Sequence, residues 1–383
     1  MKKNLLGVVV ITIILSLCLS SVVFAGGEPI KVGIVTDVGG RGDRSFNDSA
    51  ICGLETWAAK VKYVLGGGYE PLSDEEFKAS IPEDLANAGI YSMNVVPIVL
   101  ESKDKKDYIP NISTLVEQVR CDLVIGVGFM LAGSIGESAI KYPNTKFMLI
   151  DALPVDETGT VVELANVVSY LFNEHECGFL VGAIAGYATK AAKVGYIGGM
   201  PIPPVHRYEA GYWAGMKTTN PNAATFGQYT GSFTEPALGK SSAESQISLG
   251  CDILFQVAGA TGNGMFQAIC EKGEPYWAIG VDVDQGLDIN LCPDRTLTSA
   301  IKHVDYATYL AIKNVLDNTF QSGLIVMTLK DGGVGYALGR IKDVLTQEEI
   351  NKVEHLSQMI IDGEITVPQD PKNVKEWTPP TGF

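Results

Sequence analysis

The chain has 383 residues and a formal net charge of −15 at pH 7. This length predicts two domains rather than one, and the acidic balance argues against a nucleic acid or an anionic membrane as the partner. Residues 1–25 predict a secretory signal peptide, in which two lysines precede an apolar core and Ala25 stands at the cleavage site. We therefore expect a soluble, exported protein in the periplasm or at the cell surface. Lipid attachment at Cys18 is the less favoured alternative, because Leu17 before it is not small.

Residues 31–47, KVGIVTDVGGRGDRSFN, predict a buried strand, a glycine-rich loop and the start of a helix. Asp37 ends the strand, and Phe46 and Asn47 open the helix. Ligands of open α/β sheets bind at this edge, beyond the carboxyl ends of the strands. The loop lacks the G-x-G-x-x-G spacing of a dinucleotide site, and a carboxylate there would repel a phosphate. We therefore expect a small-molecule site without a nucleotide cofactor.

Three strand-like runs of the first half recur in the second half in the same order. They are KVGIVTD (31–37) and KVGYIGG (193–199), CDLVIGVG (121–128) and CDILFQVAG (251–259), and KFMLID (146–151) and YWAIGVD (276–282). Segments long enough for crossover helices separate the runs, which predicts an α/β protein with two doubly wound lobes. The first half is longer between its first two runs, and residues 66–93 are the expected insertion.

The C-terminal part predicts a helix over 298–316, a hairpin or strand within 328–338, a helix over 347–362 and an extended tail from Pro368. Six cysteines follow the leader. Their scattered positions in apolar runs favour buried thiols over a disulfide framework, although one pair remains open. No metal site is expected, because CxxC pairs and histidines at metal-ligand spacing are absent from the sequence.

Two carboxylates, Asp37 and Asp282, follow strands in the two halves. Carboxylates at a cleft accept hydrogen bonds from ligand hydroxyl or N–H groups, or they act as general acid and base. We favour acceptors, because no histidine or metal cluster accompanies them.

Four other residues offer both a binding role and a plain structural one. The rings of Phe46 and Tyr208 pack in the core or stack on a flat ligand. The loop at Gly259 presents backbone N–H groups to a ligand or simply turns from strand to helix. Lys302, on the predicted 298–316 helix, contacts a ligand or points to solvent.

Four longer segments resemble, in the same order, the basic membrane protein family of substrate-binding proteins, which are purine-nucleoside receptors of ABC transporters. The segments are VTDVGGRGDRSFND (35–48), VGYIGGMPIPPVHRYEAGYWAG (194–215), FQVAGATGNG (255–264) and IGVDVDQG (279–286). The resemblance covers nearly the whole mature chain. It implies the type I periplasmic-binding-protein fold, in which two Rossmann-like lobes are joined by a three-crossing hinge. The expected lobes are 26–151 plus 283–322, including the insertion, and 152–282 plus 323–383.

The resemblance also implies where the ligand contacts lie. In this family a purine stacks between two aromatic rings, and acidic and amide groups bind the base and the ribose. Phe46 and Tyr208 match the stacking pair. The remaining implied contacts are Asp37, Asn47, Phe129, Gly259, Asp282 and Lys302. Many members carry an acidic residue a few positions after Phe129, where this chain has Gly133.

The resemblance therefore implies a non-enzymatic, monomeric receptor that binds a purine nucleoside between its lobes and presents it to an ABC-transporter permease. Two alternatives remain open. One is a nucleoside hydrolase that uses Asp37 or Asp282 as base, and the other is a ligand-sensing subunit of a signalling receptor.

Overall fold

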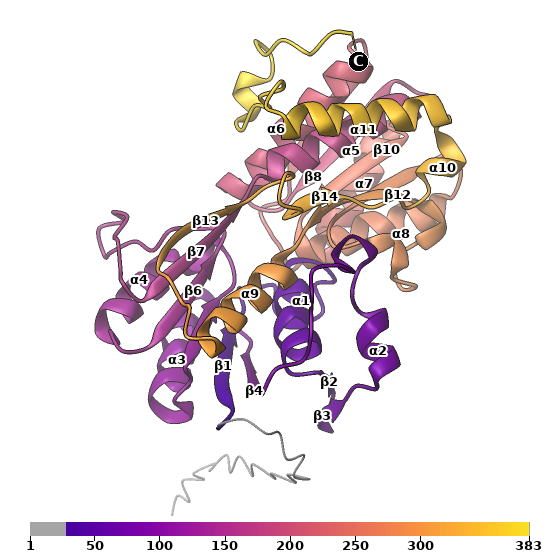
Figure 1. Ribbon diagram of the computed structural model, residues 1–383. Helices are drawn as coiled ribbons and strands as arrows, with labels where there is room; N and C mark the ends of the chain where they lie inside the picture. The colour runs from indigo at the N-terminus through magenta and orange to yellow at the C-terminus, as the bar shows by residue number, and fades with distance from the viewer. Residues whose placement is uncertain (1–27, 383) are drawn as a thin grey trace, which may run out of the picture.

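The computed structural model describes residues 28–382. The predicted signal peptide, with Cys18 and Ala25, lies outside the described residues. The chain forms two α/β lobes, each built on a six-stranded sheet, and Figure 1 shows the first lobe below the second. Within residues 28–382, no helix combines the length and the apolar character needed to cross a membrane.

The first sheet is parallel throughout and is covered by helices on both faces. Its strands are, in order across the sheet, β4 (Val95–Leu100), β1 (Ile30–Val35), β5 (Leu123–Gly126), β6 (Lys146–Ile150), β7 (Val167–Phe172) and β13 (Gly323–Met327). One face packs on α1 (Phe46–Ile51), its π-helical continuation (Cys52–Ala58) and α9 (Val304–Leu316). The other packs on α3 (Tyr108–Ser113) and α4 (Ala132–Lys141). Burial on both faces explains why the central strands are continuous apolar runs.

The second sheet repeats this plan with one antiparallel edge strand, β14. Its order is β9 (Ala224–Tyr229), β8 (Lys193–Gly198), β10 (Ile253–Val257), β11 (Trp277–Asp282), β12 (Thr296–Lys302) and β14 (Val334–Tyr336). Its covering helices are α5 (Glu174–Ala188), α6 (Pro203–Thr219), α7 (Pro236–Ser248), α8 (Gly262–Lys272), α10 (Ile341–Val344) and α11 (Gln347–Ile361). Strands β1, β5 and β6 hold the same places in the first sheet as β8, β10 and β11 hold in the second. The predicted internal repeat is therefore confirmed.

The chain passes between the two sheets after β7, after β12 and after β13. Figure 1 shows the late elements α9 and β13, in orange, lying within the first lobe. The first two passages come later than the expected boundaries at 151 and 282. The reason is that β7 pairs with β6, and β12 pairs with β11, so that each strand completes the sheet it follows. The third also comes later than 323, because β13 itself pairs with β7.

The predicted helix over 298–316 is wrong in its first part. Residues 296–302 are all buried and form β12, which is hydrogen-bonded between β11 and β14. The helix, α9, begins only at Val304. Threonine and isoleucine suit a buried strand, and the available pairing partners on both sides decide its conformation. Lys302 is consequently the last residue of a strand.

The expected insertion over 66–93 belongs to a slightly longer excursion from the first lobe. It begins with an antiparallel hairpin of β2 (Val61–Val64) and β3 (Gly68–Pro71), and α2 (Asp74–Ala79) follows. Ser73 and Glu76 form a capping box at the start of α2, because each side chain bonds the other residue's backbone N–H. Two paired strands and one short helix bury few side chains of their own, so this segment relies on contacts with the first lobe.

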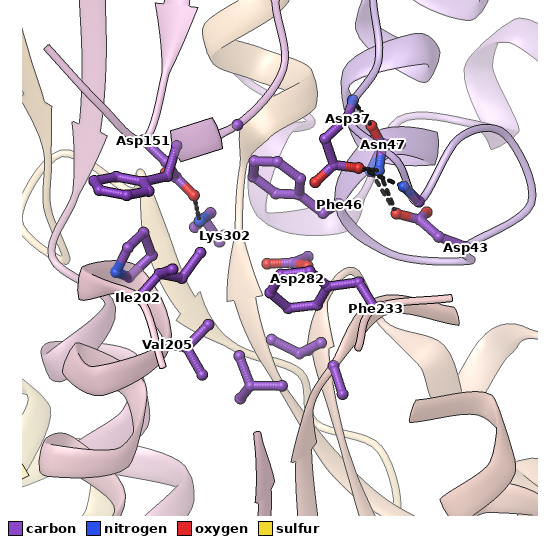
Figure 2. Close-up of a pocket in the computed structure, with 18 of the residues that line it drawn as sticks. Asp37, Asp43, Phe46, Asn47, Asp151, Ile202, Val205, Phe233, Asp282 and Lys302 are labelled. Atoms are coloured by element: carbon purple, nitrogen blue, oxygen red, sulfur yellow. Dashed lines mark hydrogen bonds and ion pairs between the residues drawn. The ribbon is translucent and has the colours of Figure 1, made fainter. Parts of the chain in front are cut away.

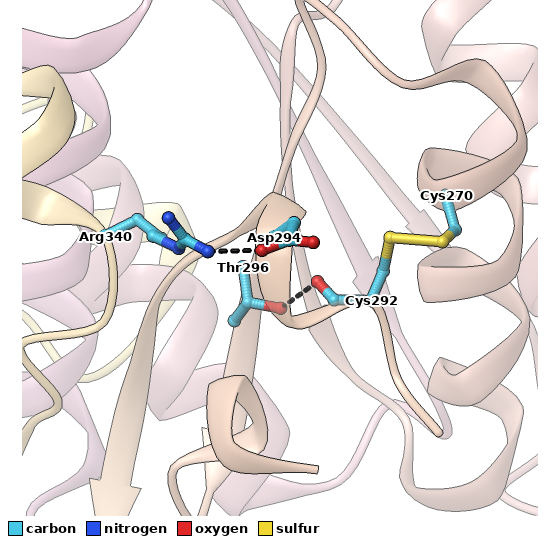
Figure 3. The surroundings of a disulfide bond; sticks show 5 residues. All are labelled: Cys270, Cys292, Asp294, Thr296 and Arg340. Carbon is cyan, nitrogen blue, oxygen red and sulfur yellow. Dashed lines mark hydrogen bonds and ion pairs between the residues drawn. A yellow bond between two sulfur atoms is a disulfide. The ribbon is translucent and has the colours of Figure 1, made fainter. Parts of the chain in front are cut away.

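One disulfide joins Cys270 on α8 to Cys292 in the loop before β12 (Figure 3). Close by, Arg340 forms an ion pair with Asp294, and the Thr296 hydroxyl donates a 2.9 Å hydrogen bond to the carbonyl of Cys292. These contacts attach the loop before β12 to the second lobe. The other cysteines between 28 and 382 are free thiols, and three of the four are buried.

Candidate functional site

A cavity lies between the lobes at the carboxyl ends of the strands (Figure 2). All eight residues that the sequence singled out line it, namely Asp37, Phe46, Asn47, Phe129, Tyr208, Gly259, Asp282 and Lys302. Gly133 lies on α4 beside Val155 and is not among the residues that line the cavity, where Met130 lies instead.

The loop after β1 is held by a compact hydrogen-bond network. The Asn47 Nδ2 donates to Asp37 Oδ1 and to Asp43 Oδ2, at 2.8 and 2.9 Å, and the Asn47 Oδ1 accepts from the Asp37 backbone N–H. Asp43 also accepts backbone N–H bonds from Ser45, just before α1, and from Asn47 and Asp48 in its first turn, as an N-cap does. The amide of Asn47 is thus used mainly to orient Asp37. Burial raises the pKa of Asp37, while the bonds from Asn47 and Gly39 oppose that shift.

The β2–β3 hairpin of the insertion contacts the loop after β1 on the side away from the cavity. Arg41, in the middle of the loop, forms a bidentate pair with Glu55 at 2.7 and 3.0 Å, and the Tyr69 hydroxyl of β3 donates to the same carboxylate at 2.6 Å. The Arg41 guanidinium lies 4.6 Å from the centroid of the Tyr63 ring on β2. The hairpin therefore packs against the loop after β1 and does not extend freely from the surface.

Lys302 lies at the centre of a buried charge cluster. Its Nζ donates to Asp151 Oδ2 at 2.6 Å and to Glu174 Oε1 at 3.2 Å, and Glu174 also accepts a 2.6 Å bond from Arg207. Burial alone would lower the pKa of Lys302, but Asp151, Glu174 and Asp282 raise it above its ordinary value. The same Nζ lies 4.8 Å from the centroid of the Phe46 ring. Of the two roles considered for Lys302, the solvent-exposed one is wrong.

Asp282 ends β11 opposite this cluster, and its Oδ1 accepts a 3.1 Å hydrogen bond from the Tyr208 hydroxyl. Burial raises the pKa of Asp282 to about 7, although the positive charge of Lys302 acts in the opposite direction. Among residues 28–382, no group of three or more His, Cys, Asp or Glu side chains is arranged to hold a metal ion. The site instead offers oxygen acceptors beside a single cation, which suits a ligand that carries hydroxyl and N–H groups.

Aromatic rings enter the cavity from both lobes. Figure 2 shows Phe46 of the first lobe and Phe233 of the second pointing into the same space. Tyr208 also lines it, although its side chain is 1% exposed and its hydroxyl is bound to Asp282. Two rings of the second lobe therefore line the cavity, of which the sequence identified one.

Sequence reasoning missed Asp151, Glu174, Arg207 and Phe233. Asp151 was within reach, since it ends the run KFMLID just as Asp282 ends YWAIGVD. Phe233 follows β9 at the same edge of the sheet. Glu174 and Arg207 lie on α5 and α6, and no local pattern indicates that they meet Lys302. Their roles depend on packing between elements that are distant in the sequence.

The raised pKa of Asp282 predicts a pH-dependent stability of the unliganded protein. A carboxyl with a pKa near 4 when unfolded and about 7 when folded favours the folded state below pH 4, and this contribution is lost as pH rises toward 7. Relative to the wild type, Asp282→Asn should therefore gain up to about 1.4 kcal/mol of unfolding free energy per pH unit between pH 5 and 7. Urea denaturation of both proteins at several pH values measures this difference. A difference that does not change with pH would show that Asp282 titrates normally.

A family model described as ABC transporter substrate-binding protein PnrA-like matches residues 30–371, nearly all of the described chain. The chain belongs to this family of substrate-binding proteins. The family assignment and the geometry agree, because such proteins bind their ligand between two lobes, where this cavity lies.

Relatives and solved structures support the assignment over most of the chain. The chain is 32% identical to the ABC transporter nucleoside-binding protein BmpA of Lactococcus lactis, covering 88% of this chain and 89% of that one. It is 31% identical to basic membrane protein A of Borreliella burgdorferi, covering 95% and 98%. A solute-binding protein of an ABC transporter system from Aeropyrum pernix superposes with a TM-score of 0.73 at 28% identity, covering 91% and 96%. The predicted fold, with its two lobes and three crossings, is thereby confirmed.

Proposed function

We propose that this protein is an exported receptor that binds a purine nucleoside between its lobes and delivers it to the permease of an ABC transporter. The observation that carries the proposal is the cavity itself, in which aromatic rings and buried oxygen acceptors from both lobes face one space. A flat base fits between rings, and a sugar offers hydroxyl groups to carboxylates. The name of the Lactococcus relative supports the same ligand class.

Charge distinguishes a nucleoside from its phosphorylated forms. Asp37, Asp43, Asp151 and Asp282 line the cavity together with one cation, Lys302, which is already paired with Asp151. Carboxylates that line one cavity repel a negatively charged phosphate group and so disfavour its entry. The proposed ligand is therefore neutral and rich in hydrogen-bond donors.

Ligand binding would act by favouring the closed arrangement of the lobes. Asp37 and Phe46 belong to the first lobe and Gly259 and Asp282 to the second, so a ligand that contacts both is bound most tightly when the lobes are closed. A permease would then recognise the closed form. We propose a monomer in this role, and family membership favours it over the hydrolase and the sensor subunit.

Export and anchoring belong to the same proposal. We propose cleavage after Ala25, with lipid attachment at Cys18 as the alternative. A relative from Pyrococcus furiosus, 31% identical over 88% of this chain, is named a lipoprotein, which keeps the alternative open. Mass spectrometry of the exported protein decides between them, because a lipidated N-terminus and a free Gly26 differ in mass.

A thermal-shift screen of ribonucleosides, free bases, nucleoside monophosphates and pentoses tests the ligand class. We expect inosine, guanosine or adenosine to raise the melting temperature by at least about 3 °C at one hundred times the dissociation constant. Monophosphates should give little shift. Chromatography of the same mixtures should recover the nucleoside intact, whereas its hydrolysis would support the enzyme. The nucleoside proposal fails when another class shifts the melting temperature and nucleosides do not.

A further inference from the structure

Two contacts join the lobes at a place outside the ligand cavity. Arg44, in the loop after β1 of the first lobe, forms an ion pair with Asp288, which follows β11 in the second lobe. The backbone carbonyl of Arg44 also accepts a 2.9 Å hydrogen bond from Gln285 Nε2 of the second lobe. These three residues are not among the described residues that line the ligand cavity, and they line a neighbouring cavity instead. The contacts therefore depend on how close the lobes are and can form without a ligand.

Gln285 has a fixed place in the second lobe. It is buried, and its Oε1 accepts hydrogen bonds from Gln256 Nε2 at 2.8 Å and from the Val281 backbone N–H at 3.0 Å. Gln256 Oε1 in turn accepts a 3.0 Å bond from the backbone N–H of Ala258. Val281 and Ala258 both line the ligand cavity. A buried polar network with satisfied members holds one arrangement, so the Gln285 amide links the cavity wall of the second lobe to Arg44 of the first.

Arg44 has an equally defined place in the first lobe. Its backbone is left-handed, with φ of +59°, a conformation that residues other than glycine seldom adopt. Its backbone N–H donates a 2.9 Å hydrogen bond to Asp48 Oδ2. Asp43 directly before it and Phe46 two residues after it line the ligand cavity. The bond from Gln285 thus reaches the backbone of the loop after β1 between two residues of the cavity wall.

We infer that Arg44 and Asp288, with the Gln285 amide beside them, form a clasp that stabilises the closed arrangement of the lobes without contacting the ligand. This inference rests on the proposed binding between the lobes and adds positioning residues for it. Opening the lobes would separate the pair. The apparent dissociation constant of a ligand is its intrinsic value divided by the fraction of protein in the binding-competent, closed form. A contact made only on closure raises that fraction and so strengthens the binding of every ligand by the same factor.

A purely local role for Asp288 explains less. Within its own loop Asp288 uses Oδ1, which accepts bonds from the backbone N–H and the side-chain amide of Asn290, at 2.8 and 2.9 Å. Its other oxygen, Oδ2, pairs with Arg44 of the other lobe. Asp294 provides a matched control, because its ion pair with Arg340 lies within the second lobe. Both pairs join an aspartate to an arginine, and only the first crosses between the lobes.

Calorimetric titration of Arg44→Met, Asp288→Asn and the double variant with inosine, guanosine and adenosine tests the inference. Each single variant should bind all three nucleosides about threefold to tenfold more weakly, the effect of losing one partly exposed ion pair that favours closure. Stopped-flow measurements should show faster dissociation. The double variant should lose no more than the larger single loss, because the two substitutions break the same contact. Asp294→Asn should retain wild-type affinity.

Several results would overturn the inference. These are unchanged affinity in both single variants, losses that differ among the nucleosides, additive losses in the double variant, and an equal loss in Asp294→Asn. Circular dichroism checks folding, and Arg44→Gln replaces Arg44→Met if that protein does not fold. A wild type that binds no nucleoside contradicts the proposed function itself, and the same titrations then use the compound class that raises the melting temperature. A wild type that binds nucleosides while the variants fail this pattern contradicts only the clasp.

Discussion

Replacing Lys302 with methionine should cost the folded protein about 3–5 kcal/mol at pH 8, the usual effect of removing one partner from a buried ion pair. Lys302 is 2% exposed and donates hydrogen bonds to Asp151 and Glu174, while Asp282 belongs to the same cluster. Methionine fills a similar volume, so the loss reflects charge rather than packing. The three carboxylates would then repel one another in a desolvated site.

Urea denaturation measures the loss of unfolding free energy. Comparing the loss at pH 8 with that at pH 5 shows whether it comes from repulsion between carboxylates. Near pH 5 the loss should be smaller, because carboxyl groups without their cation take up protons and the repulsion disappears. Lys313→Met is the matched control, since Lys313 of α9 forms an exposed ion pair with Asp317, just after the helix. A pair of that kind contributes little to stability. Equal losses in the two variants, or a loss for Lys302→Met that is independent of pH, would contradict the central role given to Lys302.

Replacing Phe46 with alanine should weaken nucleoside binding by about tenfold to a hundredfold while leaving the protein folded. Stacking of a base on an aromatic ring contributes about 1–3 kcal/mol. The Phe46 ring faces the cavity, and Lys302 Nζ lies 4.8 Å from its centroid, so its removal affects both the base and the cation. Phe46 is only partly buried at the first position of α1, which limits the cost to folding.

Isothermal titration with the best nucleoside of the thermal-shift screen provides the test. Phe77→Ala is the control, because Phe77 is a partly buried phenylalanine of α2 that does not belong to the cavity lining. It should retain wild-type affinity. An unchanged affinity in Phe46→Ala would remove Phe46 from the binding site. The corresponding Phe233→Ala variant then tells whether the opposing ring of the second lobe takes part.

The architecture was largely predictable because a duplicated pattern is a local signal. Buried parallel strands need continuous apolar runs, and the same three runs in the same order in each half indicate two lobes of the same kind. Asp37, Asp282 and Gly259 end these runs, and the carboxyl ends of parallel strands meet at one edge of a sheet. Their common location in the cavity follows from that rule. Their contact with a ligand stays a prediction.

The errors share one physical cause, which is pairing between segments far apart in the chain. The stretch 296–302 carries residues that suit either a helix or a strand, and its buried place between β11 and β14 decided for a strand. The first two crossings come later than predicted for the same kind of reason, because β7 pairs with β6 and β12 pairs with β11. Local propensity is weak compared with the burial of a whole strand.

The amino-acid pattern alone thus specified two doubly wound lobes, the edge where the cavity lies and several of the residues along it, since strand period and strand ends are properties of short segments. Folding in three dimensions decided the electrostatics of the site. It brought Lys302 from the end of β12 to Asp151 of the other lobe and to Glu174 on α5, across sequence separations of 151 and 128 residues. It also assigned the Asn47 amide to Asp37. Charge pairing and desolvation depend on distances between side chains, and packing of the two lobes determines those distances.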